Sequence, residues 1–343
     1  MGITMLRIIS DGMGHLRHFI ILLLIAFGVT AGASALEIKI ASIAPENSPY
    51  GVALNQLAAD WENISGGQVQ VTIYHNGIAG DQADMLRKIR IGQIQGGVFT
   101  NTGISVIAPQ VLSLSVPFLV RNDNEFSYVL KQITPLLDRA LQDQGLKGLA
   151  WGEVGWVKFF STQELRTPDD LKTMRVAVPP EQQAFGDAFK LLGYRPVPLD
   201  MPETLSALNS GLVDVIYTSP LIVAGYQWFG VAKYMLNLDI APAAGCIVLS
   251  ERAWNRVPQQ FRSQFEAAAH RAAQKIQDGL ITLEGGAVDL MKQYGLHITP
   301  VTPQIKREWQ DTFEAHFNDI VGPVFDRPTF DIIEKELKKY RNQ

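Results

Sequence analysis

The chain has 343 residues, of which 47% are hydrophobic and 19% are charged, and its formal net charge is −4. This composition is typical of a globular protein with one large or two medium domains, and it excludes an intrinsically disordered chain. The sequence contains no basic block and no aromatic-basic stripe, so nothing in it indicates nucleic-acid binding.

The first 35 residues differ from the rest of the chain. Basic residues precede an apolar run at residues 19–29, and small residues ending in Ala33-Ser34-Ala35 follow it. This pattern predicts a signal peptide at residues 1–35, cleaved near Ala35, and therefore export to the periplasm. The alternative is an uncleaved N-terminal anchor, although the run is shorter than the about 20 residues that span a bilayer. Cys246 is the only cysteine, which excludes an intramolecular disulfide and favours a bacterial periplasm.

From residue 36, strand and helix patterns alternate. The Asp81 and Asp84 carboxylates lie at the start of a predicted helix, where we expect them to cap it. Glycines break one apolar stretch into two short predicted strands. The predictions for this half are strands at 37–44, 69–75 and 96–100, helices at 48–65, 83–92 and 126–145, and two short strands within 147–161 around Gly152 and Gly155.

The same alternation then restarts, which predicts two α/β lobes. The second half is predicted to hold strands at 174–179, 212–220 and 297–302, an extended segment at 194–199, helices at 181–193 and 202–211, a long helix at 256–295 and a helical tail from residue 302. We place lobe I at residues 36–156 plus 246–285 and lobe II at residues 157–245 plus 286–343.

Motifs of known catalytic chemistry are missing from the sequence. There is no G-x-S-x-G, H-E-x-x-H, phosphate loop or G-x-G-x-x-G, and the histidines are scattered singly. We therefore predict a protein that is not an enzyme and that uses no cofactor and no metal. The segment at residues 150–230 is instead rich in aromatic residues next to glycine turns, which suits a cleft between lobes. For Phe159, Phe160 and Phe229 a place in the core is an equal alternative, whereas Trp156 and Tyr217 favour the cleft.

Three segments, taken together and in this order, carry a resemblance to a known family. Residues 38–99, "LRTPDDLKTMRVAVP" at 165–179 and "LSALNSGLVDVIYTSPL" at 205–221 resemble the periplasmic solute-binding proteins of TRAP (tripartite ATP-independent periplasmic) transporters, the DctP-like family. The resemblance covers nearly all of the chain after residue 35. It implies a two-lobe fold like that of type II periplasmic binding proteins, with a cleft between the lobes and a long connecting helix. It also implies a receptor that delivers a small molecule to membrane permease subunits.

The chain departs from the family pattern at the residues that usually bind a carboxylate. Ala177 stands where the family has a clamping arginine, and Val157, beside Lys158, stands at a second arginine position. Arg175 lies two residues before Ala177, so both side chains can share a strand face. Ser219 replaces an asparagine, and Met201 falls at an aromatic position.

Without these arginines, a carboxylate loses charge-assisted bonds worth about 1.5–3 kcal/mol each. We therefore hypothesise a hydrophobic or amphipathic ligand, as in a subgroup of the family that works with a periplasmic tetratricopeptide-repeat partner. The alternatives are an organic acid clamped by Lys158 or Arg175, and a partner-binding scaffold with a vestigial cleft. The expected ligand-binding residues are Trp156, Val157, Lys158, Arg175, Ala177, Met201, Tyr217, Thr218, Ser219, Trp228 and Phe229.

Overall fold

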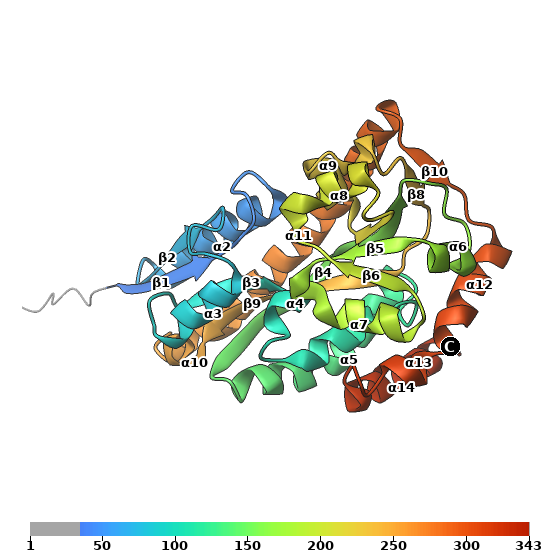
Figure 1. Ribbon diagram of the computed structural model, residues 1–343. Helices are drawn as coiled ribbons and strands as arrows, with labels where there is room; N and C mark the ends of the chain where they lie inside the picture. The colour runs from blue at the N-terminus through green and yellow to red at the C-terminus, as the bar shows by residue number, and fades with distance from the viewer. Residues whose placement is uncertain (1–34, 343) are drawn as a thin grey trace, which may run out of the picture. The chain divides into compact units, whose positions relative to one another are not determined.

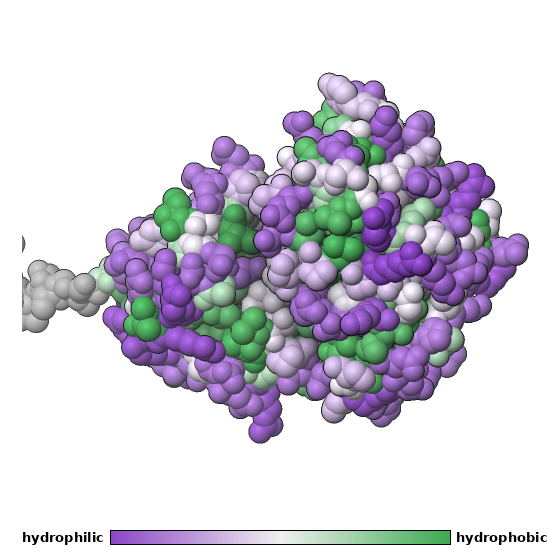
Figure 2. All heavy atoms as spheres, in the orientation of Figure 1, coloured by the Kyte–Doolittle hydropathy of each residue, from purple (hydrophilic) through white to green (hydrophobic). Residues whose placement is uncertain are grey.

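The computed structural model describes residues 35–342. All of the predicted signal peptide except Ala35, the residue near which cleavage is predicted, lies outside these residues. The described chain is an α/β structure, as the sequence predicts, and Figure 1 shows its helices packed around one long, twisted sheet. In the described part no helix has the length and apolar character to cross a membrane. Figure 2 shows polar residues over much of one face, with apolar residues in separate patches.

The strands build a 10-stranded sheet with the order β2-β1-β3-β9-β4-β7-β5-β6, in which β8 pairs with β4 and β10 pairs with β8. In chain order they are β1 (Leu36–Ala41), β2 (Val69–Tyr74), β3 (Gly96–Thr100), β4 (Leu146–Ser161), β5 (Arg175–Val178), β6 (Arg195–Pro198), β7 (Val215–Thr218), β8 (Tyr234–Leu236), β9 (Ala241–Ser250) and β10 (His297–Thr299).

The helices cover both parts of this sheet. The α-helices are α2 (Pro49–Ser65), α3 (Gln82–Arg90), α4 (Asn101–Ile104), α5 (Asp123–Gln142), α6 (Pro168–Thr173), α7 (Gln183–Leu191), α8 (Thr204–Ser210), α9 (Pro220–Gly225), α10 (Glu251–Trp254), α11 (Gln259–Gln293), α12 (Pro303–Glu314), α13 (Phe317–Ile320) and α14 (Arg327–Arg341). Short 3-10 turns are η1 (Pro109–Ser115), η2 (Pro180–Gln182), η3 (Met201–Glu203) and η4 (Trp228–Gly230).

The structure confirms the long helix and the helical tail, and it corrects one strand prediction. Residues 147–161 do not form two short strands, because β4 continues through Gly152 and Gly155 as one strand of 16 residues. Its antiparallel partner β9 pairs with it from Leu146 to Val157, with a register shift between Glu153 and Trp156. Gly155 has φ = 111° at this irregularity, a backbone angle that favours glycine. The strand bends there instead of ending.

β9 itself was not predicted, although it is central. It pairs with β3 on one side and with β4 on the other, so it joins β1, β2 and β3 to the remaining strands. The lobe limits at residues 156 and 246 fall inside β4 and β9. The division into two lobes at these residues remains a prediction.

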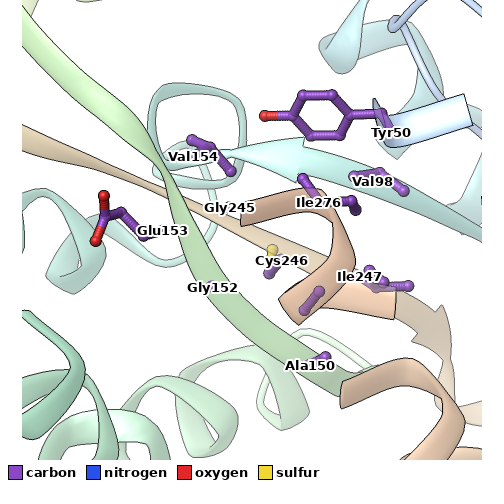
Figure 3. A pocket seen from close by; sticks show the side chains of 11 residues that line it. Tyr50, Val98, Ala150, Gly152, Glu153, Val154, Gly245, Cys246, Ile247 and Ile276 are labelled. Atoms are coloured by element: carbon purple, nitrogen blue, oxygen red, sulfur yellow. The ribbon is translucent and has the colours of Figure 1, made fainter. Parts of the chain in front are cut away.

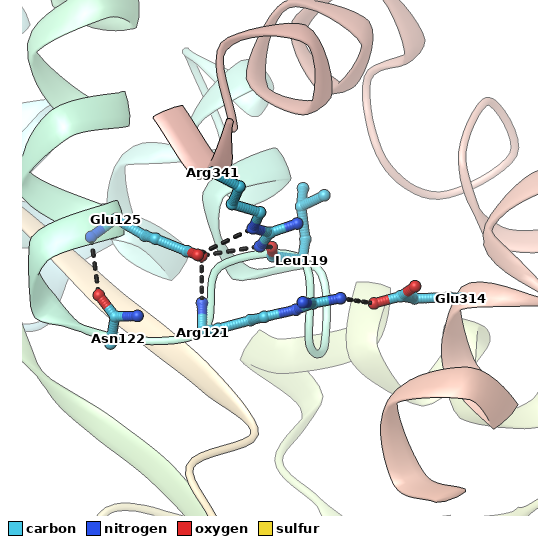
Figure 4. A network of polar contacts seen from close by, with 6 residues as sticks. All are labelled: Leu119, Arg121, Asn122, Glu125, Glu314 and Arg341. Atoms are coloured by element: carbon cyan, nitrogen blue, oxygen red, sulfur yellow. Dashed lines mark hydrogen bonds and ion pairs between the residues drawn. The ribbon is translucent and has the colours of Figure 1, made fainter. Parts of the chain in front are cut away.

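The C-terminal helix α14 is attached by an ion-pair network around the buried Glu125, drawn in Figure 4. Arg341 donates from Nε and Nη2 to the two carboxylate oxygens of Glu125, at 2.8 and 2.7 Å. The same guanidinium donates to the carbonyl of Leu119, and the backbone N–H of Arg121 donates to Glu125. Glu125 is buried, so its carboxylate depends on these donors.

Replacing Arg341 by methionine is expected to lower the free energy of unfolding by about 1–3 kcal/mol, because the buried Glu125 carboxylate loses two charge-assisted hydrogen bonds. Chemical denaturation measures this change. Lys339→Met on the same helix is the matched control, because Lys339 is exposed, and its ion pair with Glu336 contributes less than about 1 kcal/mol. Equal losses in the two variants would contradict this account of the network.

Candidate functional site

A cavity of about 250 Å³ lies where β3, β4, β5, β7 and β9 end or bend, and we call it the main cavity. From the β3 side it is lined by Thr100, Asn101 and Thr102, and from α2 by Tyr50. Thr100 ends β3 and caps α4 by accepting a hydrogen bond from the N–H of Gly103. The strand-to-helix turn therefore points polar residues at the cavity.

The opposite wall comes from the ends of two parallel strands. β5 contributes Ala177, and β7 continues through Tyr217 and Thr218 into Ser219, directly before α9. Because β5 and β7 are parallel, their carboxyl ends meet at the same edge of the sheet. Trp228 of η4 completes this wall.

A hydrogen-bond chain holds the floor of the main cavity. Asn101 donates from Nδ2 to Ser115 Oγ at 2.8 Å, and Ser115 Oγ donates to the carbonyl of Pro242 at 2.7 Å. These contacts connect α4, η1 and β9, which are far apart in sequence. Asn101 and Ser115 are buried, so these hydrogen bonds fix their positions. The side-chain amide oxygen of Asn101 has no protein partner among the described residues.

Among the described residues, the lining of the main cavity carries no formal charge. Its polar groups are hydroxyls, carboxamides and an indole. Tyr217 lines the cavity, but its hydroxyl is fully enclosed and has no hydrogen-bond partner, and its ring packs against Phe159 and Phe189. Burial raises the pKa of Tyr217 above its usual range, so this hydroxyl stays neutral.

The structure brings most of the expected ligand-binding residues together at this cavity. Residues that line it are Val157, Ala177, Met201, Tyr217, Thr218, Ser219 and Trp228. Phe229 lies outside it, packs against an apolar cluster and has its ring 6.4 Å from that of Tyr294. Trp156 and Lys158 line a different cavity, and Arg175 lines neither.

Both cations proposed as carboxylate clamps already hold carboxylates of this chain. Arg175 donates from Nε and Nη2 to Asp214 at 2.9 and 3.1 Å, and its backbone N–H donates to the same side chain. Burial alone raises the pKa of Asp214, but the hydrogen bonds from Arg175 outweigh burial and leave this pKa below its usual value. Lys158 Nζ forms an ion pair with Asp239.

Sequence reasoning missed Tyr50 and the residues at 100–102. The signal for Tyr50 is the Ser48-Pro49 start of α2, where Ser48 accepts a hydrogen bond from the N–H of Gly51. A side chain at Gly51 would collide with the carbonyl of Glu46 at 2.0 Å, so the helix start and the loop before it approach closely. The signal at 100–102 is a threonine cap directly after a buried strand.

A small apolar cavity of about 20 Å³, seen in Figure 3, adjoins the main cavity and shares Tyr50 and Val154 with it. Cys246 lies at its wall. Burial raises the pKa of the Cys246 thiol, which keeps it protonated and unreactive.

The cavity that Trp156 and Lys158 line has a volume of about 430 Å³, and we call it the acidic cavity. Its carboxylates are Asp123, Glu153, Asp239, Glu284 and Asp289. Figure 3 shows the Glu153 side chain on the side of β4 away from Cys246 and Tyr50. In the part of the chain that the structure describes, no group of side chains has an arrangement that could hold a metal ion.

Two carboxyls of the acidic cavity are harder to ionise than usual. Glu153 is 3% exposed, and its burial, followed by the charge of Asp123, raises its pKa to about 7. Burial is also the largest cause that raises the pKa of Glu284 to about 7. At neutral pH both groups are therefore partly protonated.

Comparison with known proteins identifies the kind of protein to which this site belongs. The model of the DctP family, "Bacterial extracellular solute-binding protein, family 7", matches residues 40–321. The C4-dicarboxylate-binding protein DctB of Bacillus subtilis is 22% identical over 292 residues, which are 84% of this chain and 83% of that protein.

Solved structures with a similar fold include a TRAP periplasmic solute-binding protein of Pseudomonas putida with bound D-glucuronate. The two structures superpose with a TM-score of 0.75 at 21% sequence identity, and the match covers 88% of this chain and 97% of that one. Another, from Ochrobactrum anthropi, has its C-terminus bound in the ligand-binding pocket; its TM-score is 0.80 at 23% identity, covering 90% and 96% of the two chains. These likenesses confirm the predicted fold class.

Glu153→Gln is expected to stabilise the protein above pH 7 and to leave its stability unchanged below pH 4.5, the ordinary pKa of a glutamate. Because the folded-state pKa is raised, the stability that Glu153 contributes is present at low pH and is lost as the pH rises toward about 7. The gain should be on the order of 1–2 kcal/mol. Denaturation curves across this pH range measure it, and the exposed Asp289→Asn is the control. A variant whose pH profile matches that of the wild type would contradict the raised pKa.

Proposed function

This chain belongs to the bacterial extracellular solute-binding proteins of family 7, a family of non-enzymes, and we propose that it is the periplasmic receptor of a TRAP-type secondary transporter. In this role it binds one small molecule in the main cavity and delivers it to the membrane permease. The observation that supports this role is the main cavity itself. It is bounded by the carboxyl ends of β5 and β7 on one side and by Tyr50 and the β3–α4 turn on the other.

The first candidate for the solute is a small organic acid. The relatives named above are described with a C4-dicarboxylate or with D-glucuronate. The volume of the main cavity, about 250 Å³, lies below the range of about 300–1,000 Å³ for sites that bind drug-sized ligands. It therefore suits a dicarboxylate or a sugar acid better than a lipid. This reasoning favours the acid alternative over the hydrophobic ligand expected from the missing arginines.

An uncharged amphipathic solute is the second candidate, because none of the described lining residues is a cation. The acid alternative as first expected, with Lys158 or Arg175 as the clamp, does not suit the main cavity, since both cations are paired elsewhere. An acid held here needs other donors. A tetratricopeptide-repeat partner remains a hypothesis from the resemblance alone. If this chain bound a partner protein but no solute, the scaffold alternative would be supported.

The proposed function predicts that D-glucuronate raises the melting temperature of the protein and that Lys158→Met and Arg175→Met retain this shift. A ligand at 100 times its Kd stabilises the folded state by about 2.7 kcal/mol. Thermal denaturation with and without the sugar acid measures the shift. Ala177→Leu, which fills the main cavity, should abolish it. If Lys158→Met alone abolished the shift, the acidic cavity and not the main cavity would be the binding site.

A further inference from the structure

The indole of Trp228 differs from most of the other indoles of the chain. Trp61, Trp151, Trp156 and Trp309 each donate from Nε1 to an oxygen, at distances of 2.8 to 3.1 Å. Trp228 is 3% exposed, yet its Nε1 donates to no acceptor among the described residues. The Nε1 atom of Trp228 is also not fully enclosed by the protein. Trp228 lines the main cavity, and its N–H has no protein acceptor among the described residues, so it is available to a solute.

The backbone and a neighbouring ring hold Trp228 in this place. Gln227, the residue before it, has φ = 56°, a left-handed conformation that is uncommon for a residue other than glycine. The Tyr226 ring stacks on the Trp228 ring with centroids 4.9 Å apart and planes 22° apart. Trp228 also belongs to the apolar cluster that contains Phe160 and Met235. Strain of this kind collects at binding sites, where surrounding packing maintains it.

Tyr50 supplies a second free donor from the other side of the main cavity. Its hydroxyl has no hydrogen-bond partner among the described residues, and it is not fully enclosed either. Figure 3 shows its ring reaching from the start of α2 toward Val154, with the hydroxyl at the far end. Burial raises the pKa of Tyr50 above its usual range, so the hydroxyl keeps its proton and remains a donor.

We propose that the Trp228 indole N–H and the Tyr50 hydroxyl are specificity-determining donors that bind oxygen acceptors of the solute in place of a cationic clamp. The inference rests on the proposed function and adds how the solute is recognised. Hydrogen bonds from neutral donors can satisfy a buried carboxylate, and they serve a carbonyl or sugar oxygen equally. The cavity then selects solutes by where their acceptor oxygens lie. Charge has little influence, and binding changes little with ionic strength.

The test is calorimetric titration with D-glucuronate and, separately, with its uncharged methyl ester. Trp228→Phe and Tyr50→Phe each remove one donor and keep the ring. Each should weaken binding of D-glucuronate about tenfold, the effect of about one lost hydrogen bond. Trp254→Phe and Tyr294→Phe are the matched controls, because Trp254 and Tyr294 lie outside the main cavity and Trp254 also lacks an acceptor among the described residues. The controls should bind as the wild type does, and the ester should bind within about tenfold of the acid.

Three results would overturn the inference. The first is unchanged affinity in Trp228→Phe and Tyr50→Phe, provided that both variants melt as the wild type does. The second is failure of the methyl ester to bind while the acid binds, which would indicate that a cation binds the carboxylate. The third is a wild-type protein that binds neither probe. That third result leaves the proposed function standing if the protein carries another solute when purified from the periplasm, and both proposals fail if it carries none.

Discussion

The antiparallel pairing of β4 with β9 is the constraint on which the rest of the structure depends. β9 bonds to β3 on its other edge and β4 bonds to β7 and β8, so these two strands alone connect the two ends of the sheet order. The register shift between Glu153 and Trp156 bends the pair where the cavities form. Val154 and Val157 from β4, with Pro242 and Ala243 from β9, reach the main cavity from this region. The main cavity is therefore a consequence of how these two strands pair.

This arrangement separates a cavity lined by charged side chains from one lined by neutral side chains. Glu153 faces the acidic cavity, while Val154, the next residue along β4, faces the main cavity. Lys158 and Arg175, the cations nearest in sequence to the expected clamp, are held by Asp239 and Asp214. Moving either cation to a solute would leave a carboxylate unpaired, at a cost that a single new ion pair does not clearly recover. Val157 and Ala177, where the resemblance predicts arginines, thus line a cavity whose donors are neutral.

The sequence was sufficient where a local signal decides the structure. β3 runs over the predicted residues 96–100, and Asp81 caps α3 by accepting a hydrogen bond from the N–H of Asp84 at 2.8 Å. It was insufficient where long-range pairing decides. Gly152 and Gly155 read locally as breaks, but hydrogen bonds to β9 carry β4 through them. The main cavity shows the same limit. Motif positions predicted that Ala177 and Ser219 lie together, and both line this cavity. They did not predict the direction of the Arg175 side chain, which pairs with Asp214, 39 residues away. For Tyr50, the sequence indicated only the start of a helix and not a place in the cavity wall.

A crystal structure of the protein purified from the periplasm with whatever solute it retains tests the central claim most directly. Our account predicts one small solute in the main cavity, with acceptor oxygens at hydrogen-bond distance from Trp228 Nε1 and the Tyr50 hydroxyl. The Arg175–Asp214 and Lys158–Asp239 pairs should remain intact. A solute bound through Lys158 or Arg175, or one seated in the acidic cavity, would contradict the account.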